Sequence, residues 1–155
     1  MTPTPPLHQT RVWPLSHLDS FRFRRRLRRI LTDGGLVVYP TDTLYGMGGD
    51  FCNPEVHRRI DCIKERSDKP YSAAVWDMGA LKGLSSFLPP WLDKNAGRIF
   101  PGPFTVILPA NPCVKRNLLR GTDTIGLRIP AHPFPKEALA EIQIRLISTS
   151  INRSG

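Results

Sequence analysis

The pattern of apolar and polar residues predicts a chain in which helices and strands alternate. Short apolar runs of the kind that form strands occur at residues 36–40, 72–76, 104–108, 124–130 and 146–150. Apolar residues at roughly helical spacing predict helices over residues 18–31, 54–64, 79–87, 90–99 and 133–142. This interleaving favours a single α/β (α+β) domain built around a twisted sheet.

The first predicted helix has an unusually basic outer face. Its inner stripe is formed by Leu18, Phe21, Leu27, Ile30 and Leu31, and Gly34 can end it. Six arginines lie between these apolar positions: Arg22, Arg24, Arg25, Arg26, Arg28 and Arg29. Such a face is either a solvated surface or a surface for a polyanion.

Length and composition narrow the class of protein. A chain of 155 residues, 40% of them apolar, is enough for one globular domain, which we assign to residues 17–155 after a Pro- and Thr-rich tail at 1–16. No stretch has the roughly 18 apolar residues of a membrane helix. Three cysteines without a CxxC spacing argue against disulfides or zinc and favour a cytoplasmic location. A net charge of +9 suits anionic partners.

Four segments carry residue types that bind ligands. The first, residues 40–49, brings hydroxyls and a carboxylate to the end of a predicted strand, where ligands sit in open α/β sheets. The alternative is a polar turn that bonds its own backbone. The second, residues 64–70, offers three cations suited to phosphate oxygens: Lys64, Arg66 and Lys69. The alternative there is a solvated helix end.

The other two segments lie in the second half of the chain. Arg128 interrupts an otherwise apolar run at 124–130, and a buried arginine needs a carboxylate partner, which a ligand could supply. The alternative is an edge strand with Arg128 in solvent. Residues 148–155 end a strand with small hydroxyl groups and Asn152, which can bond phosphate or ribose. Several common motifs are absent, namely GxxxxGK[ST], GxSxG and HExxH.

The order and spacing of five segments resemble the YrdC-like family. They are PTDTLYGMG, KERSDKP, PGPFTVIL, TIGLRIPAHP and STSINRSG, and together they span nearly all of residues 36–155. The resemblance implies a single α/β domain with helices flanking a mixed sheet around a basic cavity. It also implies an enzyme, a nucleotidyltransferase that converts L-threonine, bicarbonate or carbon dioxide, and ATP into threonylcarbamoyl-AMP and pyrophosphate.

The resemblance also implies a role for individual residues. Thr43, Tyr45, Arg128 and Ser148 would form the threonine pocket, with Arg128 on the substrate carboxylate. Lys64, Arg66 and Lys69 would bind the ATP phosphates. Contacts to the rest of the nucleotide would come from Thr124, Ser150 and Asn152. No protein nucleophile or protein-bound metal is needed, because positioning and charge neutralisation suffice, with Mg²⁺ arriving on the nucleotide.

Three departures from the family pattern qualify these roles. The spacing between Arg66 and Lys69 is one residue short, and Ile151 stands where alanine is usual. The sequence also stops at Gly155, inside the last motif, so we expect a domain truncated at its C-terminal end. Such a truncation would leave strand edges unpaired.

Partners and alternatives follow from the same resemblance. The product would pass to a separate complex that transfers the threonylcarbamoyl group to tRNA. An alternative is a non-catalytic module of the same fold that binds tRNA or double-stranded RNA through the arginine-rich helix. A carbamoyl-adenylating unit of hydrogenase maturation is a further alternative, but its usual zinc-finger-like cysteines are lacking here.

Overall fold

The computed structural model describes residues 10–65, 69–114 and 116–152. Its α-helices are α1 (Phe21–Thr32), α2 (Pro54–Lys64), α3 (Met78–Lys82), α4 (Pro90–Ile99) and α5 (Ala140–Ile142). Two segments are 3₁₀-helical, η1 (Leu15–His17) and η2 (Arg116–Leu119). A π-helical segment, η3 (Phe134–Leu139), leads into α5. The strands are β1 (Val37–Tyr39), β2 (Gly46–Gly48), β3 (Ser72–Ala74), β4 (Val106–Pro109), β5 (Thr124–Arg128) and β6 (Leu146–Ser150).

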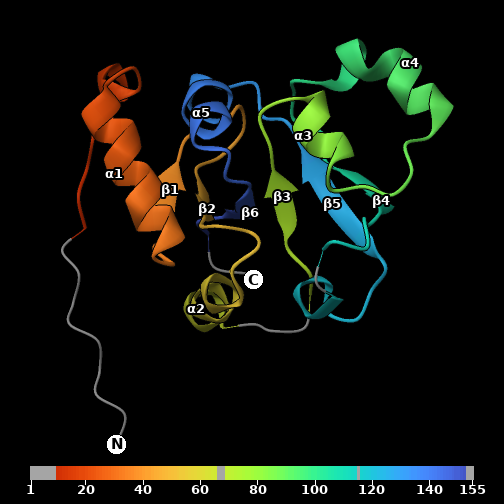
Figure 1. Ribbon diagram of the computed structural model, residues 1–155, viewed down its shortest axis with the longest axis horizontal. Coiled ribbons are helices and arrows are strands. Elements are labelled where there is room, and N and C mark those ends of the chain that lie inside the picture. Colours follow the sequence, from red (N-terminus) through yellow and green to blue (C-terminus); the bar gives the residue numbers. More distant parts are fainter. Residues whose placement is uncertain (1–9, 66–68, 115, 153–155) are drawn as a thin grey trace, which may run out of the picture.

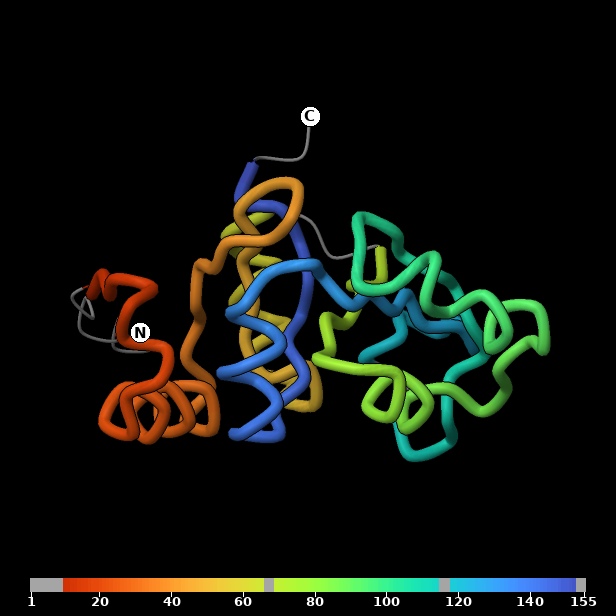
Figure 2. Tube along the Cα trace, turned by 90° about the horizontal axis from the view of Figure 1, so that it is seen from above, coloured from red at the N-terminus to blue at the C-terminus, as the bar shows by residue number. Residues whose placement is uncertain are grey.

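The strands form one mixed sheet in the order β1-β2-β6-β3-β5-β4 (Figure 1). β3 and β5 are parallel, and every other neighbouring pair is antiparallel. The expectation of a single α/β domain with a mixed sheet and flanking helices is therefore confirmed. Viewed from above, α1 lies at one end of the molecule and α3 and α4 lie toward the other (Figure 2).

The main hydrophobic core lies on one face of the sheet. Met47, Ala73, Ile125, Leu127 and Ile147 project from four strands onto this face and are buried by helices α2, α3 and α4. Because side chains alternate along a strand, their immediate neighbours must project from the opposite face. Ser72 of β3, Thr124 and Arg128 of β5, and Ser148 and Ser150 of β6 therefore share that second face.

The second face is covered at only one end. Tyr39 and Leu146 pack there against α1, η3 and α5, in a smaller cluster that includes Leu27 and Leu31. Tyr39 stacks on Phe134, with ring centroids 5.4 Å apart. The remainder of this face, toward β3 and β5, carries polar residues.

β2 lies within residues 41–50, which the sequence pattern predicts to be a loop. Its glycines explain why it pairs so closely with its neighbours. A Cβ on Gly48 would lie 2.0 Å from the carbonyl oxygen of Ile147 on β6, so only glycine fits. β2 itself, Gly46–Gly48, has no β-branched or aromatic residue, so its sequence gives no sign of a strand.

α2 begins as predicted, because the Asn53 side chain accepts a hydrogen bond from the amide of Glu55 and Pro54 occupies the first turn. Helical spacing predicts an inner stripe of Val56, Ile60 and Ile63. Val56 and Ile60 are buried, but Ile63 is 53% exposed, so the prediction is wrong at that position. Lys64 is buried instead, so the side of the helix end that faces the domain interior carries a charged residue.

α1 also has the predicted position, with Gly34 (φ +76°) just beyond its end. Leu27 and Leu31 are its buried residues, whereas Phe21 is 72% exposed, so the predicted stripe is wrong at that position. No helix in the described part of the chain is long and apolar enough to cross a bilayer.

Candidate functional site

A row of small polar residues crosses the open part of the second sheet face. Ser72 on β3 is paired with Ser148 on β6, and its hydroxyl would lie 2.5 Å from a Cβ on Gly126 of β5. The three positions are therefore level across three strands. Absence of a side chain at Gly126 leaves room above the sheet between Ser72 and its β5 neighbours. This row forms the floor of the candidate site.

Arg128 lies at one end of this floor, two residues beyond Gly126 on β5. Its Nη2 is 3.0 Å from Oδ1 of Asp42, and the side chains are only 14% and 11% exposed. The expected carboxylate partner of Arg128 is thus supplied by the chain itself. β5 lies between β3 and β4, so the alternative of an edge strand with Arg128 in solvent is wrong.

The pair retains unused hydrogen-bonding atoms. Asp42 Oδ2 and Arg128 Nε are both buried and have no hydrogen-bond partner among the described residues. Buried polar atoms normally have partners. Each member of the pair therefore retains hydrogen-bonding capacity that no described residue uses.

Tyr39 lies close to the same pair. Its phenol donates to the carbonyl of Ile147 (3.2 Å) and is within hydrogen-bonding reach of the Ser148 side chain. Burial raises the pKa of Tyr39 above its ordinary 10.0, and the Ser148 hydrogen bond and the charge of Arg128 oppose that rise. Tyr39 is therefore a neutral hydrogen-bonding group that fixes Ser148 in the floor.

The loop between β1 and β2 overhangs the floor. Thr41 organises it: its hydroxyl donates to the carbonyl of Leu44 (2.7 Å) and accepts from the amide of Thr43 (3.1 Å). The local bonds of the alternative polar-turn interpretation are thus present. They leave the side chains of Thr43 and Tyr45 exposed, and so available to a ligand.

Lys64 reaches the end of β6 from α2. Its Nζ donates to the carbonyl of Ser150 (2.9 Å) and to the carbonyl of Asn152, and the residue is 6% exposed. The structure thus brings together three of the residues assigned to the nucleotide. It does not support three neighbouring free cations, because Lys64 is buried against backbone oxygens. Lys69 is exposed, and Arg66 lies outside the described residues.

Thr124 lies at the opposite end of β5 from Arg128. The strand registers place it level with Ser150 on β6, two strands away or about 10 Å. Arg128 and Thr124 therefore lie at opposite ends of β5, but the two sets of residues are not fully separated. The carbonyl of Tyr45, assigned to threonine, accepts from the amide of Ile151 (3.2 Å), next to Ser150. Thr124 and Ser150 are exposed there.

α2 is tied to the far half of the sheet by a polar cluster. Asp61 accepts from the Tyr71 hydroxyl (2.9 Å) and is paired with Arg120, which follows η2. His57, one turn earlier, shares a hydrogen bond of 2.7 Å with the carbonyl of Phe51. Burial lowers the pKa of His57 below 6.5, so it is neutral near pH 7. These contacts fix the helix that carries Lys64.

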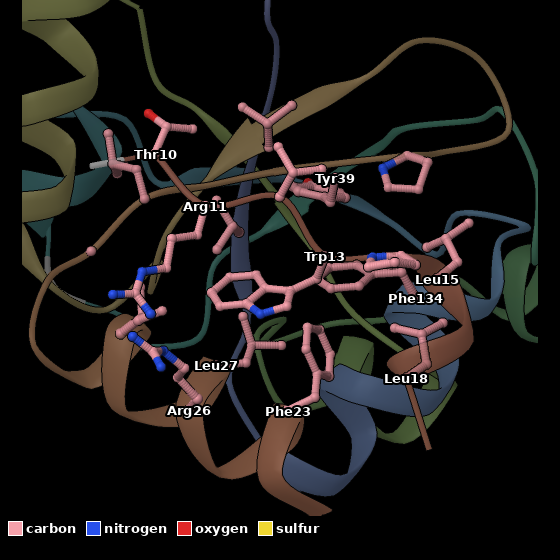
Figure 3. A pocket seen from close by; sticks show the side chains of 18 of the residues that line it. Thr10, Arg11, Trp13, Leu15, Leu18, Phe23, Arg26, Leu27, Tyr39 and Phe134 are labelled. Atoms are coloured by element: carbon pink, nitrogen blue, oxygen red, sulfur yellow. The ribbon is translucent and has the colours of Figure 1, made fainter. Parts of the chain in front are cut away.

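A cavity of about 970 Å³ lies elsewhere, between α1, β1 and the segment before α1 (Figure 3). It is basic, with Arg11, Arg26 and Arg59 in its wall. Among the described site residues predicted from the sequence, only Tyr45 lines it. The residues on the sheet face and this cavity are therefore two separate features that meet at the β1–β2 loop.

Metal binding by the protein finds no support in the described ranges. Within residues 10–65, 69–114 and 116–152, no group of three or more His, Cys, Asp or Glu side chains could hold an ion.

Sequence reasoning missed two contributors to the floor and one partnership. Ser72 is a single polar residue at the start of an apolar strand, and Tyr39 ends the first strand. Both break an apolar run and could have been singled out for that reason. The Asp42–Arg128 pair had no local signal, because it joins residues 86 apart.

The model of the family Sua5/YciO/YrdC, described as "Telomere recombination", matches residues 29–155. A threonylcarbamoyl-AMP synthase of Chromobacterium violaceum is 32% identical over 143 residues, which is 92% of this chain and 74% of the relative. A threonylcarbamoyl-AMP synthase of Pyrococcus abyssi is 31% identical over 126 residues, or 81% of this chain.

The solved structures agree. Sua5 of P. abyssi, complexed with L-threonine, superposes with a TM-score of 0.79 at 30% identity over 85% of this chain and 39% of its own. YciO of Escherichia coli gives a TM-score of 0.74 at 28% identity, over 83% and 63% of the two chains. This chain spans only 37% of the length of the P. abyssi synthase and 74% of the C. violaceum synthase. By its motif order, its sheet and the family match over residues 29–155, the chain belongs to the Sua5/YciO/YrdC family.

Proposed function

We propose that this protein is a threonylcarbamoyl-AMP synthase, which makes threonylcarbamoyl-AMP and pyrophosphate from L-threonine, bicarbonate or carbon dioxide, and ATP. The observation that carries the proposal is the polar sheet face with Arg128 at one end and Lys64, Ser150 and Asn152 at the other. Support comes from relatives named for this activity and from a relative complexed with L-threonine.

The reaction divides into two steps. In the first, the neutral amine of threonine attacks carbon dioxide, forms an N–C bond and releases one proton. In the second, a carbamate oxygen attacks the α-phosphorus of ATP, and the bond to pyrophosphate breaks. Neither step needs a protein nucleophile, so the enzyme acts by positioning both substrates and by stabilising negative charge. By the second step it is a nucleotidyltransferase.

The threonine end of the site would use the pair at Arg128. Its guanidinium fits the substrate carboxylate, and the free Oδ2 of Asp42 is available for the amino group. Ser148 forms the floor, held in place by Tyr39. Thr43 and Tyr45 would close over the substrate from the β1–β2 loop.

The nucleotide end would use the residues beside Lys64. Its charge lies at the C-terminal end of β6, where it lowers the cost of bringing phosphate groups near backbone carbonyls. Arg66 and Lys69 follow on the chain and would add cations, and Thr124, Ser150 and Asn152 would contact the rest of the nucleotide. Magnesium would enter bound to the ATP phosphates, as part of the substrate.

The product would be consumed by a transferase that modifies tRNA, because an acyl phosphate anhydride is a reactive intermediate. We further propose a cytoplasmic setting, consistent with the finding that Cys52, Cys62 and Cys113, all within the described residues, form no disulfide.

The test uses calorimetric titration of L-threonine and then ATP into the 155-residue chain, followed by pyrophosphate release with bicarbonate present. Release that requires both L-threonine and bicarbonate supports the proposal, with D-threonine as the matched control. Release without threonine, or absence of binding by both ligands, contradicts it.

A further inference from the structure

Three side chains, Asp61, Tyr71 and Arg120, form a polar cluster, the Asp61 cluster, that joins three segments of the chain. Oδ1 of Asp61 accepts from the Tyr71 hydroxyl (2.9 Å), and Oδ2 is paired with Nη2 of Arg120. The Arg120 guanidinium also lies 6.0 Å from the ring centre of Tyr71. Each of the three side chains therefore interacts with the other two.

The Asp61 cluster lies mostly out of solvent. Tyr71 is 2% exposed, and the side chains of Asp61 and Arg120 are 15% and 21% exposed. Salt screens an ion pair in such a place much less than it screens a pair on the surface. Arg120 also has a left-handed backbone (φ +53°), a conformation that residues other than glycine keep where surrounding contacts fix it. The contacts of the cluster therefore hold this part of the chain in one arrangement.

The cluster spans the segment that carries the cations assigned to phosphate, residues 64–70. Asp61 lies one helical turn before Lys64 on α2, and Tyr71 directly precedes β3. Residues 66–68 of the segment lie outside the described part of the chain. The hydrogen bond between Asp61 and Tyr71 therefore fixes the points at which this segment leaves α2 and enters β3.

Arg120 extends the cluster to β5. The short turn between Arg120 and β5 is bonded internally, because the Thr122 hydroxyl donates to the carbonyls of Leu119 (2.8 Å) and Thr124 (3.2 Å). Thr124 is the first residue of β5. The end of α2, the start of β3 and the turn before β5 lie at the same edge of the sheet (Figure 1). The cluster thus connects Lys64 to Thr124, two residues assigned to the nucleotide on separate elements.

We propose that the Asp61 cluster is a set of positioning residues for ATP. It sets the separation of Lys64 and Thr124 and so prepares their side of the site for the nucleotide. A group that is already in place loses less entropy when the ligand binds. The inference rests on the proposed synthase function, and it adds three residues to which no ligand contact is assigned.

A direct contact between Arg120 and phosphate fits the structure less well. Nη2 of Arg120 is engaged by Asp61, and Nε is enclosed by protein atoms, without a hydrogen-bond partner among the described residues. Arg128, which is assigned to threonine, lies at the other end of β5 and is held by Asp42 instead. Loss of the Asp61 cluster should therefore affect ATP much more than threonine.

The test is calorimetric titration of ATP and, separately, of L-threonine into the 155-residue chain and its variants. Tyr71→Phe removes one hydroxyl and keeps the ring beside the Arg120 guanidinium. Arg120→Gln removes the charge, and Arg120→Lys retains it. The matched control is Arg24→Gln, which loses ion pairs to Asp19 and Glu141 on α1, far from this edge of the sheet.

Tyr71→Phe and Arg120→Gln should each weaken ATP binding by about 10-fold and threonine binding by less than about 2-fold. Arg120→Lys should recover part of the ATP affinity, and Arg24→Gln should keep both affinities. Circular dichroism and urea unfolding verify that the variants fold and rank their stabilities. A role in stability alone would not separate the two ligands.

Four outcomes would overturn the proposal. They are equal weakening of both ligands, an ATP loss in Arg24→Gln as large as that in Arg120→Gln, unchanged ATP binding in Tyr71→Phe, and no ATP binding by the wild type. Pyrophosphate release that depends on threonine is measured in parallel on the wild type. Its absence would contradict the synthase function, while the ATP affinities of the variants would still decide the positioning role.

Discussion

Arg128 and Asp42 lie 86 residues apart in the chain, yet Nη2 of the first is 3.0 Å from Oδ1 of the second. The contact connects an inner strand to the loop after β1, and it leaves one buried polar atom unused on each partner. A guanidinium held in this way is oriented before a ligand arrives. Preorganisation of this kind reduces the entropy lost on binding.

Arg128→Ala should weaken threonine binding by about 2 kcal/mol or more, roughly 30-fold, because a substrate carboxylate would lose a charge-assisted partner. ATP binding should change much less. Calorimetry with each ligand measures both effects. Arg98→Ala, on an exposed turn of α4, is the matched control and should leave both affinities unchanged. Equal weakening of threonine and ATP would contradict the role of Arg128.

Asp42→Asn should destabilise the ligand-free protein by about 2 kcal/mol, because Arg128 would retain a buried charge without its counter-charge. The double variant Asp42→Asn, Arg128→Met should cost less than the sum of the two single changes, since no charge is then left unpaired. Urea unfolding of the four proteins gives the coupling free energy. Simple additivity would show that the 3.0 Å contact is energetically neutral.

Lys64→Ala should reduce ATP affinity more than threonine affinity and should loosen the end of β6. The lost ammonium is the donor to the carbonyls of Ser150 and Asn152. Hydrogen exchange at residues 149–152 and calorimetry with ATP report the two effects. Lys94→Ala, exposed on α4, serves as control. Normal ATP binding by the Lys64 variant would remove this residue from the nucleotide site.

Stability should fall between pH 7 and pH 5 through His57. Its pKa is lowered in the folded state, chiefly by burial, with Arg120 acting in the same direction and the Phe51 carbonyl, Asp61 and Asp50 opposing. Below pH 6.5 the unfolded chain therefore binds more protons, so the free energy of unfolding decreases until the folded pKa is passed. Urea midpoints should show this decrease in the wild type and in the exposed-site variant His17→Gln. The His57→Gln variant should lose less stability between pH 7 and pH 5. If its loss equals that of the wild type, groups other than His57 cause the pH dependence.

Arg24→Gln should lower the free energy of unfolding by about 1 kcal/mol, whereas Arg25→Gln should leave it within about 0.5 kcal/mol of the wild type. The difference arises because Arg24 contacts Leu18, Asp19 and Glu141, while Arg25 is exposed on the outer face of α1. Thermal unfolding of the two single variants, which have the same net charge, is the measurement. Equal stability would show that the contacts of Arg24 contribute nothing.

The sequence by itself determined the class of fold and most element positions. Apolar runs at residues 72–76, 124–130 and 146–150 became strands, and Asn53 with Pro54 started α2 as local capping chemistry requires. These features depend on neighbours within a few residues, so spacing and propensity are sufficient to predict them. Five motifs in order also identified the family, which the match over residues 29–155 confirms.

Only the tertiary structure decided the register and the partners. β2 was hidden because its strand character comes from close approach to β6 at Gly48, which has no local signal. The sequence assigned Lys64 to the phosphates, and only the structure shows that its ammonium also donates to the carbonyls at the end of β6. Arg24 was expected on the outer face of α1, but it anchors that helix. In each case the partner is distant in sequence, and burial, not residue type, determines which polar groups remain free to meet a ligand.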